Sequence, residues 1–385
     1  MSIVNKYFSL LIIGVAISSS SFGQAASSPY SSLGIGDYYG NALIHNQGMG
    51  GVGYSQPQFW FTNNMNPALL VYNNLTTFEA GMLSENRKIS GDTINQKEQG
   101  GNLNYLVMAF PIKLNKWTSS IGIMPFTNVD YRLQYLDDVE GSTAPVTVTE
   151  EGSGGLSQLY WSNGVRLSPD FSIGLKITYI FSSITNSYSN IVDVPSQPVP
   201  FLVVREEKTS VSDFTFLGGV SYSKDSLWNG DYRLSIGAIY SFAADLKTES
   251  ETKFSRTSLA GDTIQGYNLF GSNGQISLPS GFGGGVSISK GFKWSVGADV
   301  LLQDWTQFAH FNNEDVLQAT QYSKYALGGE FTPDYLSVSY LKRITYRTGV
   351  SIENYPFLAN GNKVKDFGIN FGFSLPAGRS NINLA

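Results

Sequence analysis

The sequence predicts an all-β protein: a transmembrane antiparallel β-barrel with an N-terminal segment, or hatch, inside its lumen. Aromatic residues make up 14% of the chain and charged residues also only 14%, whereas charged residues are near a quarter of an ordinary soluble domain. From Thr76 onward, apolar residues alternate with small or polar ones, as side chains on opposite faces of a strand do. Residues 24–75 are rich in Gly and Asn and lack this alternation, so we assign them to the hatch and residues 76–385 to the barrel.

Residues 1–23 are predicted to be a signal peptide. Lys6 provides the positive charge, Tyr7 to Ile17 is apolar, and Ser21 to Gly23 offers small residues for cleavage before Gln24. The apolar stretch of about 11 residues is too short for a spanning helix, which needs about 20. We therefore expect export of the chain and, given the strand pattern, residence in the cell outer membrane.

The alternation is clearest in two stretches, Phe171 to Phe181 and Phe367 to Ser374. A soluble β-sandwich would also alternate, so periodicity alone leaves that fold open. Against it, the polar face carries charges such as Lys176, Asp299 and Arg347, which a dry sandwich core could not hold without partners. Aromatic residues near strand ends favour a barrel with interfacial girdles.

Connections between the predicted strands alternate in length, with short links on one side and long loops on the other, as in outer-membrane barrels. Short links are expected at 112–116, 168–170, 224–231, 290–293 and 376–379, and long loops near 84–102, 137–155, 183–210, 247–280, 305–320 and 354–363. This pattern gives about 12 complete strands and a partial one from Ser380 to Ala385. Outer-membrane barrels have an even number of strands, so a thirteenth strand requires a fourteenth. We expect a complete barrel to have about 14 strands and the gene to encode about 30 to 50 further residues, ending in an aromatic residue.

Composition disfavours several classes of function. The chain has no cysteine, which excludes disulfides, thiolate catalysis, cysteine-bound zinc and a lipoprotein anchor. The only histidines are His45 and His310, so no metal or cofactor is expected, and no arrangement of nucleophile and base suggests an enzyme. A net charge of −5 argues against nucleic acid as a partner.

Gly48 to Gly53 matches the dinucleotide-binding pattern G-x-G-x-x-G. That pattern requires a preceding strand, a following helix and an acidic residue about 20 positions later, where this chain has Asn73. We therefore expect these glycines to allow close packing of the hatch against the wall.

The tripeptide Asn66-Pro67-Ala68 has a local explanation. Asn caps a short helix, and Pro occupies the first helical position, where its missing N–H costs nothing. On residues alone, a helix start with no further role is the favoured interpretation over a functional motif.

In context, the chain resembles the FadL/TodX family of outer-membrane transporters for hydrophobic compounds, in which Asn-Pro-Ala is the hatch motif. Leu278-Pro279, Trp294, Asp304-Trp305 and Phe308 are similar to a second region of the family. Gly48 to Gly53 and Gly152 to Gly155 resemble its Bacteroidota branch. The resemblance implies a fourteen-stranded barrel plugged by the hatch.

The resemblance implies passive uptake of hydrophobic small molecules such as long-chain fatty acids, with lateral exit through the wall. The alternative is a FadL-like barrel that acts as a binding or assembly component, for example a shuttle with a secretion partner in type IX protein secretion. We take Asn66, Pro67 and Ala68 as hatch residues and expect Phe59, Trp60 and Phe61 either to contact the ligand or to pack the hatch on the wall. An acidic stretch contains Asp137, Asp138, Glu140, Glu150 and Glu151; it is either a solvated loop or a site where divalent cations bridge to lipopolysaccharide.

Overall fold

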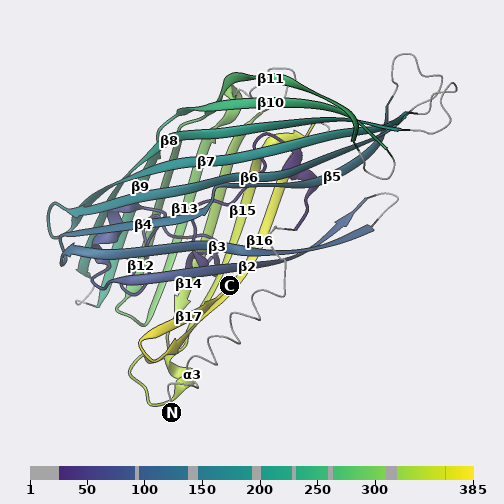
Figure 1. Ribbon diagram of the computed structural model, residues 1–385. Coiled ribbons are helices and arrows are strands. Elements are labelled where there is room, and N and C mark those ends of the chain that lie inside the picture. The colour runs from purple at the N-terminus through teal and green to yellow at the C-terminus, as the bar shows by residue number, and fades with distance from the viewer. Residues whose placement is uncertain are drawn as a thin grey trace, which may run out of the picture.

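Strands dominate the computed structural model, in which seventeen described strands belong to one antiparallel sheet (Figure 1). The structure describes residues 26–91, 95–137, 146–192, 201–227, 231–258, 263–308, 319–359 and 361–385. The predicted signal peptide and His310 lie outside these residues. None of the helices among the described residues is long and apolar enough to cross a membrane.

The wall strands follow each other along the chain as β2 (Thr77–Ser90), β3 (Asn95–Lys113), β4 (Trp117–Pro125), β5 (Thr127–Asp137), β6 (Val146–Arg166), β7 (Phe171–Val192), β8 (Phe201–Leu227), β9 (Tyr232–Ser241), β10 (Ala244–Ser258), β11 (Thr263–Leu278), β12 (Gly281–Lys290), β13 (Trp294–Asp304), β14 (Gln321–Phe331), β15 (Thr345–Ala359), β16 (Asn362–Ala377) and β17 (Ser380–Leu384). Short elements precede the wall: η1 (Pro29–Ser32), β1 (Asp37–Tyr38), α2 (Ile44–Gln47) and η2 (Pro67–Tyr72). Two more lie in links: η3 (Trp305–Gln307) and α3 (Tyr340–Arg343).

Three of the wall strands are each split in two. β4 and β5 both pair with β6, β9 and β10 both pair with β8, and β12 and β11 continue each other beside β9 and β10. Joining these halves turns the sixteen described strands β2 to β17 into twelve complete strands and a short thirteenth, β17. The predicted all-β fold is confirmed, as are the twelve complete strands and the partial one predicted for this chain; the fourteen strands expected of a complete barrel stay a prediction.

The side chains alternate across the wall as predicted. On β7, Phe171, Ile173 and Leu175 face outward, while Ser172 and Lys176 are buried inside. Similar outward rows of exposed apolar residues occur on most wall strands, for example Phe367, Ile369, Phe371 and Phe373 on β16. A wall that exposes apolar side chains and keeps polar ones inside is suited to lipid around it.

The predicted long loops at 84–102, 137–155, 183–210, 247–280 and 354–363 are wrong as loops, because most of each range is strand. β6, β7 and β8 are 21, 22 and 27 residues long, whereas β13 and β14 have 11 each, so one side of the wall is much taller (Figure 1). Hairpins that extend beyond a bilayer meet water on both faces and lose the apolar alternation by which strands are recognised. We call the end of the barrel with these extended hairpins the loop side and the opposite end, with the short links, the turn side.

Candidate functional site

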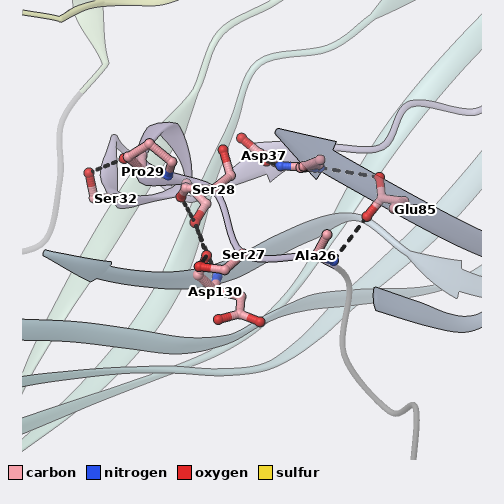
Figure 2. A network of polar contacts seen from close by, with 10 residues as sticks. Ala26, Ser27, Ser28, Pro29, Ser32, Asp37, Glu85 and Asp130 are labelled. Carbon is pink, nitrogen blue, oxygen red and sulfur yellow. Dashed lines mark hydrogen bonds and ion pairs between the residues drawn. The ribbon is translucent and has the colours of Figure 1, made fainter. Parts of the chain in front are cut away.

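The N-terminal segment begins at the loop side, where it is tied to the wall (Figure 2). The backbone N–H of Ala26 donates to Glu85 Oε2 at 3.1 Å, and the N–H of Ser28 donates to the carbonyl oxygen of Asp130 at 2.8 Å. Arg87 joins this anchor by ion pairs with Asp37 at 3.0 Å and Glu85 at 3.2 Å. The segment therefore runs down the lumen from a fixed loop-side end.

A short strand of this segment covers the break in the third wall strand. β4 and β5 separate at Phe126, and the pairing with β6 resumes only at Val129. The exposed backbone edge is used by β1, where Asp37 lies opposite Asn128 and Tyr38 opposite Thr127. The hatch thus closes what would otherwise be a gap in the ladder of backbone hydrogen bonds.

Asn66, Pro67 and Ala68 begin the 3-10 helix η2 as the sequence suggests. The Asn66 side chain accepts the N–H of Ala68 at 3.0 Å, and Pro67 occupies the first position. The same side chain donates to the carbonyl oxygen of Tyr54 at 2.7 Å, which ties two hatch turns together. Asn66 therefore has a cap role and a second, tertiary one.

The wall meets this helix with glycines. A Cβ on Gly174 of β7 would fall within 3.0 Å of the Pro67 and Ala68 backbone, and one on Gly219 of β8 would fall within 3.0 Å of the side-chain oxygen of Asn66. Ser172 Oγ also donates to the carbonyl oxygen of Ala68 at 2.9 Å. The hatch motif is packed directly on the wall, and the cavities of the lumen lie elsewhere.

The three aromatic residues of the hatch diverge. Phe61 is buried and stacks on His45 with ring centroids 5.0 Å apart. Phe59 packs edge-on against Tyr72, and Trp60 is half exposed. All three line a cavity at the turn side.

Three cavities lie in the lumen between the hatch and the wall. A loop-side cavity of about 30 Å³ is lined by apolar groups such as Leu33, Ile35 and Phe357. A central cavity of about 90 Å³ and a wall cavity of about 80 Å³ follow. Tyr38 and Gln303 line all three, so these two side chains stand where the cavities meet.

The wall cavity ends at a discontinuity in the sheet. The pairing of β8 with β9 stops at Leu217, opposite Ser241, and the pairing with β10 resumes at Val211, opposite Thr248. Between residues 212–216 of β8 and residues 242–247 the ladder is interrupted, and one backbone hydrogen bond remains, from the Phe242 N–H to the Phe216 carbonyl oxygen at 3.0 Å. The next strand breaks at the same height, at residues 279–280. We call this the wall opening, and Phe216, Phe242 and Pro279 beside it line the wall cavity.

Lys176 provides a cation to the wall cavity. Its ammonium group donates to Asn41 Oδ1 at 2.9 Å and to Asn64 Oδ1 at 3.0 Å, and it lies 4.2 Å from the centre of the Tyr160 ring. The contacts described for this ammonium group include no carboxylate. A buried ammonium group with only neutral partners is expensive to maintain, and a perturbed titratable group in a cavity is a candidate functional residue.

The protein-family model BamG matches residues 4–385 of the chain. The chain belongs to the BamG family. A comparison of this BamG-family chain with curated protein sequences found no match. The assignment to a Bacteroidota branch stays a prediction.

Solved structures similar to this BamG-family chain share its FadL-like barrel fold. A Pseudomonas aeruginosa FadL homologue is 12% identical, with 90% of this chain and 89% of that chain covered and a TM-score of 0.58. The monoaromatic hydrocarbon channel CymD is 12% identical, with 88% and 89% covered and a TM-score of 0.51. A deltaS2S3 mutant of TodX, also a monoaromatic hydrocarbon channel, is 14% identical, with 90% and 92% covered and a TM-score of 0.52.

Other motifs of this BamG-family chain have structural explanations. Gly48 to Gly53 packs against the wall, where Met49 and Gly50 approach Gly328 and Gly349. Glu150 and Glu151 lie on β6 and are engaged by Tyr131 at 2.9 Å and Arg132 at 3.0 Å. Asp138 and Glu140 lie outside the described residues. Within the described ranges, no cluster of three or more acidic or histidine side chains is arranged to hold a metal ion.

Sequence reasoning named Lys176, Leu278, Pro279 and Trp305, which line the wall cavity, but it did not predict that they lie together around a cavity. Tyr38, Gln303 and Lys176 come from three distant segments, and only pairing of β1 with β5 and of β13 with its neighbours brings them together. Two local signals were present. Pro279 cannot donate to a sheet ladder, and Lys176 is a charge on a row that faces the lumen.

Proposed function

We propose that this protein takes up hydrophobic small molecules passively across the outer membrane and releases them sideways through the wall opening. One observation carries the proposal: three neighbouring lumenal cavities share the lining residues Tyr38 and Gln303, the first among apolar loop-side residues and the last beside Phe216 and Phe242 at the opening. Tyr38 and Gln303 are the side chains that a ligand would have to pass.

A lateral exit is physically sensible for an apolar cargo. Each buried CH₂ group is worth about 0.8 kcal/mol, so an apolar molecule gains by moving from a dry cavity into lipid and loses by crossing water. The hatch residues Leu69, Leu70 and Val71 are fully buried, so they obstruct the straight route to the turn side. The wall opening is the one discontinuity in the described ladder that the cavities reach and the hatch leaves uncovered.

The cavities restrict the ligand. Ligand pockets are usually about 300 to 1,000 Å³, so volumes of 80 and 90 Å³ require side chains to move as a ligand passes. The solved structures titled monoaromatic hydrocarbon channels support small apolar molecules as the class. Lys176 supports an additional preference for ligands with a carboxylate, such as fatty acids.

The second candidate function is a binding or assembly component that holds a partner protein, such as a secreted one. The observation in its favour is that Asn66 to Ala68 pack on Gly174 and Gly219 and leave no ligand space beside the motif. The tall hairpins of β6, β7 and β8 would offer a partner a surface at the loop side. Divalent cations that bridge acidic residues of this side to lipopolysaccharide are a separate proposal.

Native mass spectrometry of the full-length protein released from outer membranes separates the two candidates. Transport predicts a co-purified apolar ligand that is lost from a Trp305→Ala/Gln303→Ala variant, because both side chains line the lumenal cavities. A stoichiometric protein partner and no small molecule would favour the second candidate. A Trp161→Ala variant, which removes an outward-facing aromatic, is the matched control.

A further inference from the structure

A fourth cavity lies at the turn side and shares no lining residue with the three lumenal ones. Its volume is about 590 Å³, within the range of about 300 to 1,000 Å³ for small-molecule sites. The hatch contributes one wall through Gln56 to Phe61, and the β12–β13, β14–β15 and β16–β17 links contribute the others. We call it the turn-side cavity.

The charge of this cavity is opposite to that of the chain. The chain has a net charge of −5, yet the acidic lining of the cavity consists of Glu330 alone. Five cationic side chains line the same cavity: Arg233, Lys293, Arg343, Arg347 and Arg379. Two of the five are neutralised, because Arg347 pairs with Glu330 at 3.0 Å and Arg233 pairs with Asp225.

The other three cations, Lys293, Arg343 and Arg379, make no ion pair with any residue that the structure describes. Lys293 lies in the β12–β13 turn, Arg343 ends α3, and Arg379 lies in the β16–β17 turn, so three separate links bring them to one rim. Converging uncompensated cations in a partly enclosed cavity attract an anion.

Aromatic side chains form the apolar part of the same cavity. Phe292 packs against Phe59, Trp60 and Tyr335 with centroid distances of 5.3, 5.8 and 5.4 Å. Trp60 remains 50% exposed and Tyr335 48% exposed, so both rings keep a free surface. An aromatic ring could stack on them while its anionic group meets the cations.

Buried polar atoms around the cavity lack partners. Gln56 and Gln58 are 2% and 5% exposed, and Gln56 Oε1 and Gln58 Nε2 make no hydrogen bond; neither does Arg343 Nε. Such groups are rare in folded proteins because leaving each unsatisfied costs free energy. They are independent evidence that a polar molecule completes this site.

We propose that the turn-side cavity binds small anionic molecules with an aromatic or apolar body. The anionic group binds Arg343 and Arg379, with Lys293 nearby, and the body stacks on Trp60 and Tyr335. This is a second ligand site, separate from the uptake route, and it lies at the turn side, which in outer-membrane barrels faces the periplasm.

Two fluorescent molecules with almost the same aromatic body test the proposal on the full chain in nanodiscs. 8-Anilinonaphthalene-1-sulfonate is anionic, and N-phenyl-1-naphthylamine is its neutral counterpart. An Arg343→Gln/Arg379→Gln variant should weaken saturable binding of the sulfonate about tenfold and leave the neutral compound within about twofold, because only the charged hydrogen bonds are lost. Trp60→Ala should weaken both.

The matched control is Arg132→Gln, which removes an exposed arginine from β5, outside the cavity. It should change neither affinity. Equal losses of both compounds in the double arginine variant, or no loss of the sulfonate, would overturn the proposal, as would a wild-type chain without saturable sulfonate binding. If the double variant does not assemble, salt provides the test: raising it to about 1 M should weaken the sulfonate alone.

Discussion

Asp299 on β13 accepts the backbone N–H of Gly53 through Oδ2 at 2.6 Å, across 246 residues of sequence. The same oxygen accepts the N–H of Tyr54 at 2.8 Å. One wall carboxylate therefore fixes the turn that leads the hatch from α2 to its aromatic residues. A second wall contact lies nearby, because Gly237 on β9 packs against Tyr54 and only β12 separates β9 from β13.

Replacing Asp299 by Ala should loosen the hatch without disturbing the barrel. Hydrogen bonds to a charged group contribute about 1.5 to 3 kcal/mol, so amide exchange at residues 50–56 should accelerate about tenfold or more. Hydrogen–deuterium exchange measured by mass spectrometry reports this directly. Asp245→Ala, which removes an exposed carboxylate on β10 that accepts a hydrogen bond from Ser277, is the control. Unchanged exchange in the Asp299 variant would show that the wall holds this turn by other contacts.

Gly237→Ala should displace the hatch turn at Tyr54. A Cβ at this position would lie well inside 3.0 Å of the Tyr54 carbonyl oxygen, so either the turn or β9 has to move. We expect a lower thermal stability of the hatch and greater cleavage of residues 41–73 by protease. Gly284→Ala on the neighbouring strand meets only ordinary contacts, the nearest at 3.8 Å, and should behave as wild type. Equal behaviour of the two variants would contradict the close packing.

The hatch should weaken in acid because of His45. Its ring is buried against Phe61, and burial, with a smaller contribution from Arg347, holds the pKa of His45 well below its ordinary value. His45 is therefore protonated in the released hatch at a higher pH than in the docked hatch. The free energy of docking is unaffected above about pH 6.5 and becomes less favourable by up to about 1.4 kcal/mol per pH unit below it.

Exchange protection of residues 41–53, measured between pH 7.5 and 5, checks this expectation after correction for intrinsic exchange rates. A His45→Phe variant keeps the stacking on Phe61 and should remove this part of the pH dependence, while His310 is unchanged in both proteins. A wild-type hatch whose protection does not fall in acid, or a fall of the same size in His45→Phe, would contradict the assignment to His45.

The fold was largely predictable because strand periodicity is a local signal. Phe171 to Phe181 places apolar residues outward and polar ones inward in the structure as in the sequence. The cap by Asn66 is local too, since its partner Ala68 is two residues away. Hairpin extents were not predictable, because beyond the apolar belt the residues of β7 and β8 no longer alternate in hydrophobicity.

The site was less predictable because its contacts are long-range. Nothing near Phe59, Trp60 and Phe61 indicates that they lie at the turn side and not beside the lumenal cavities. The wall opening depends on a mismatch between two strands: six residues, 242–247, lie against five, 212–216. Such a mismatch becomes visible only once the register is known.

Reversible obstruction of the wall opening is the most direct measurement. The chain has no cysteine, so Ala243→Cys places a single thiol at the opening, and a bulky methanethiosulfonate reagent attached there can be removed by dithiothreitol. Uptake of labelled toluene and oleate into cells that rely on this protein should fall severalfold on modification and recover on reduction. Val350→Cys, outward-facing on β15, should show neither effect when modified. Uptake that is indifferent to modification at position 243 would contradict lateral release through this opening.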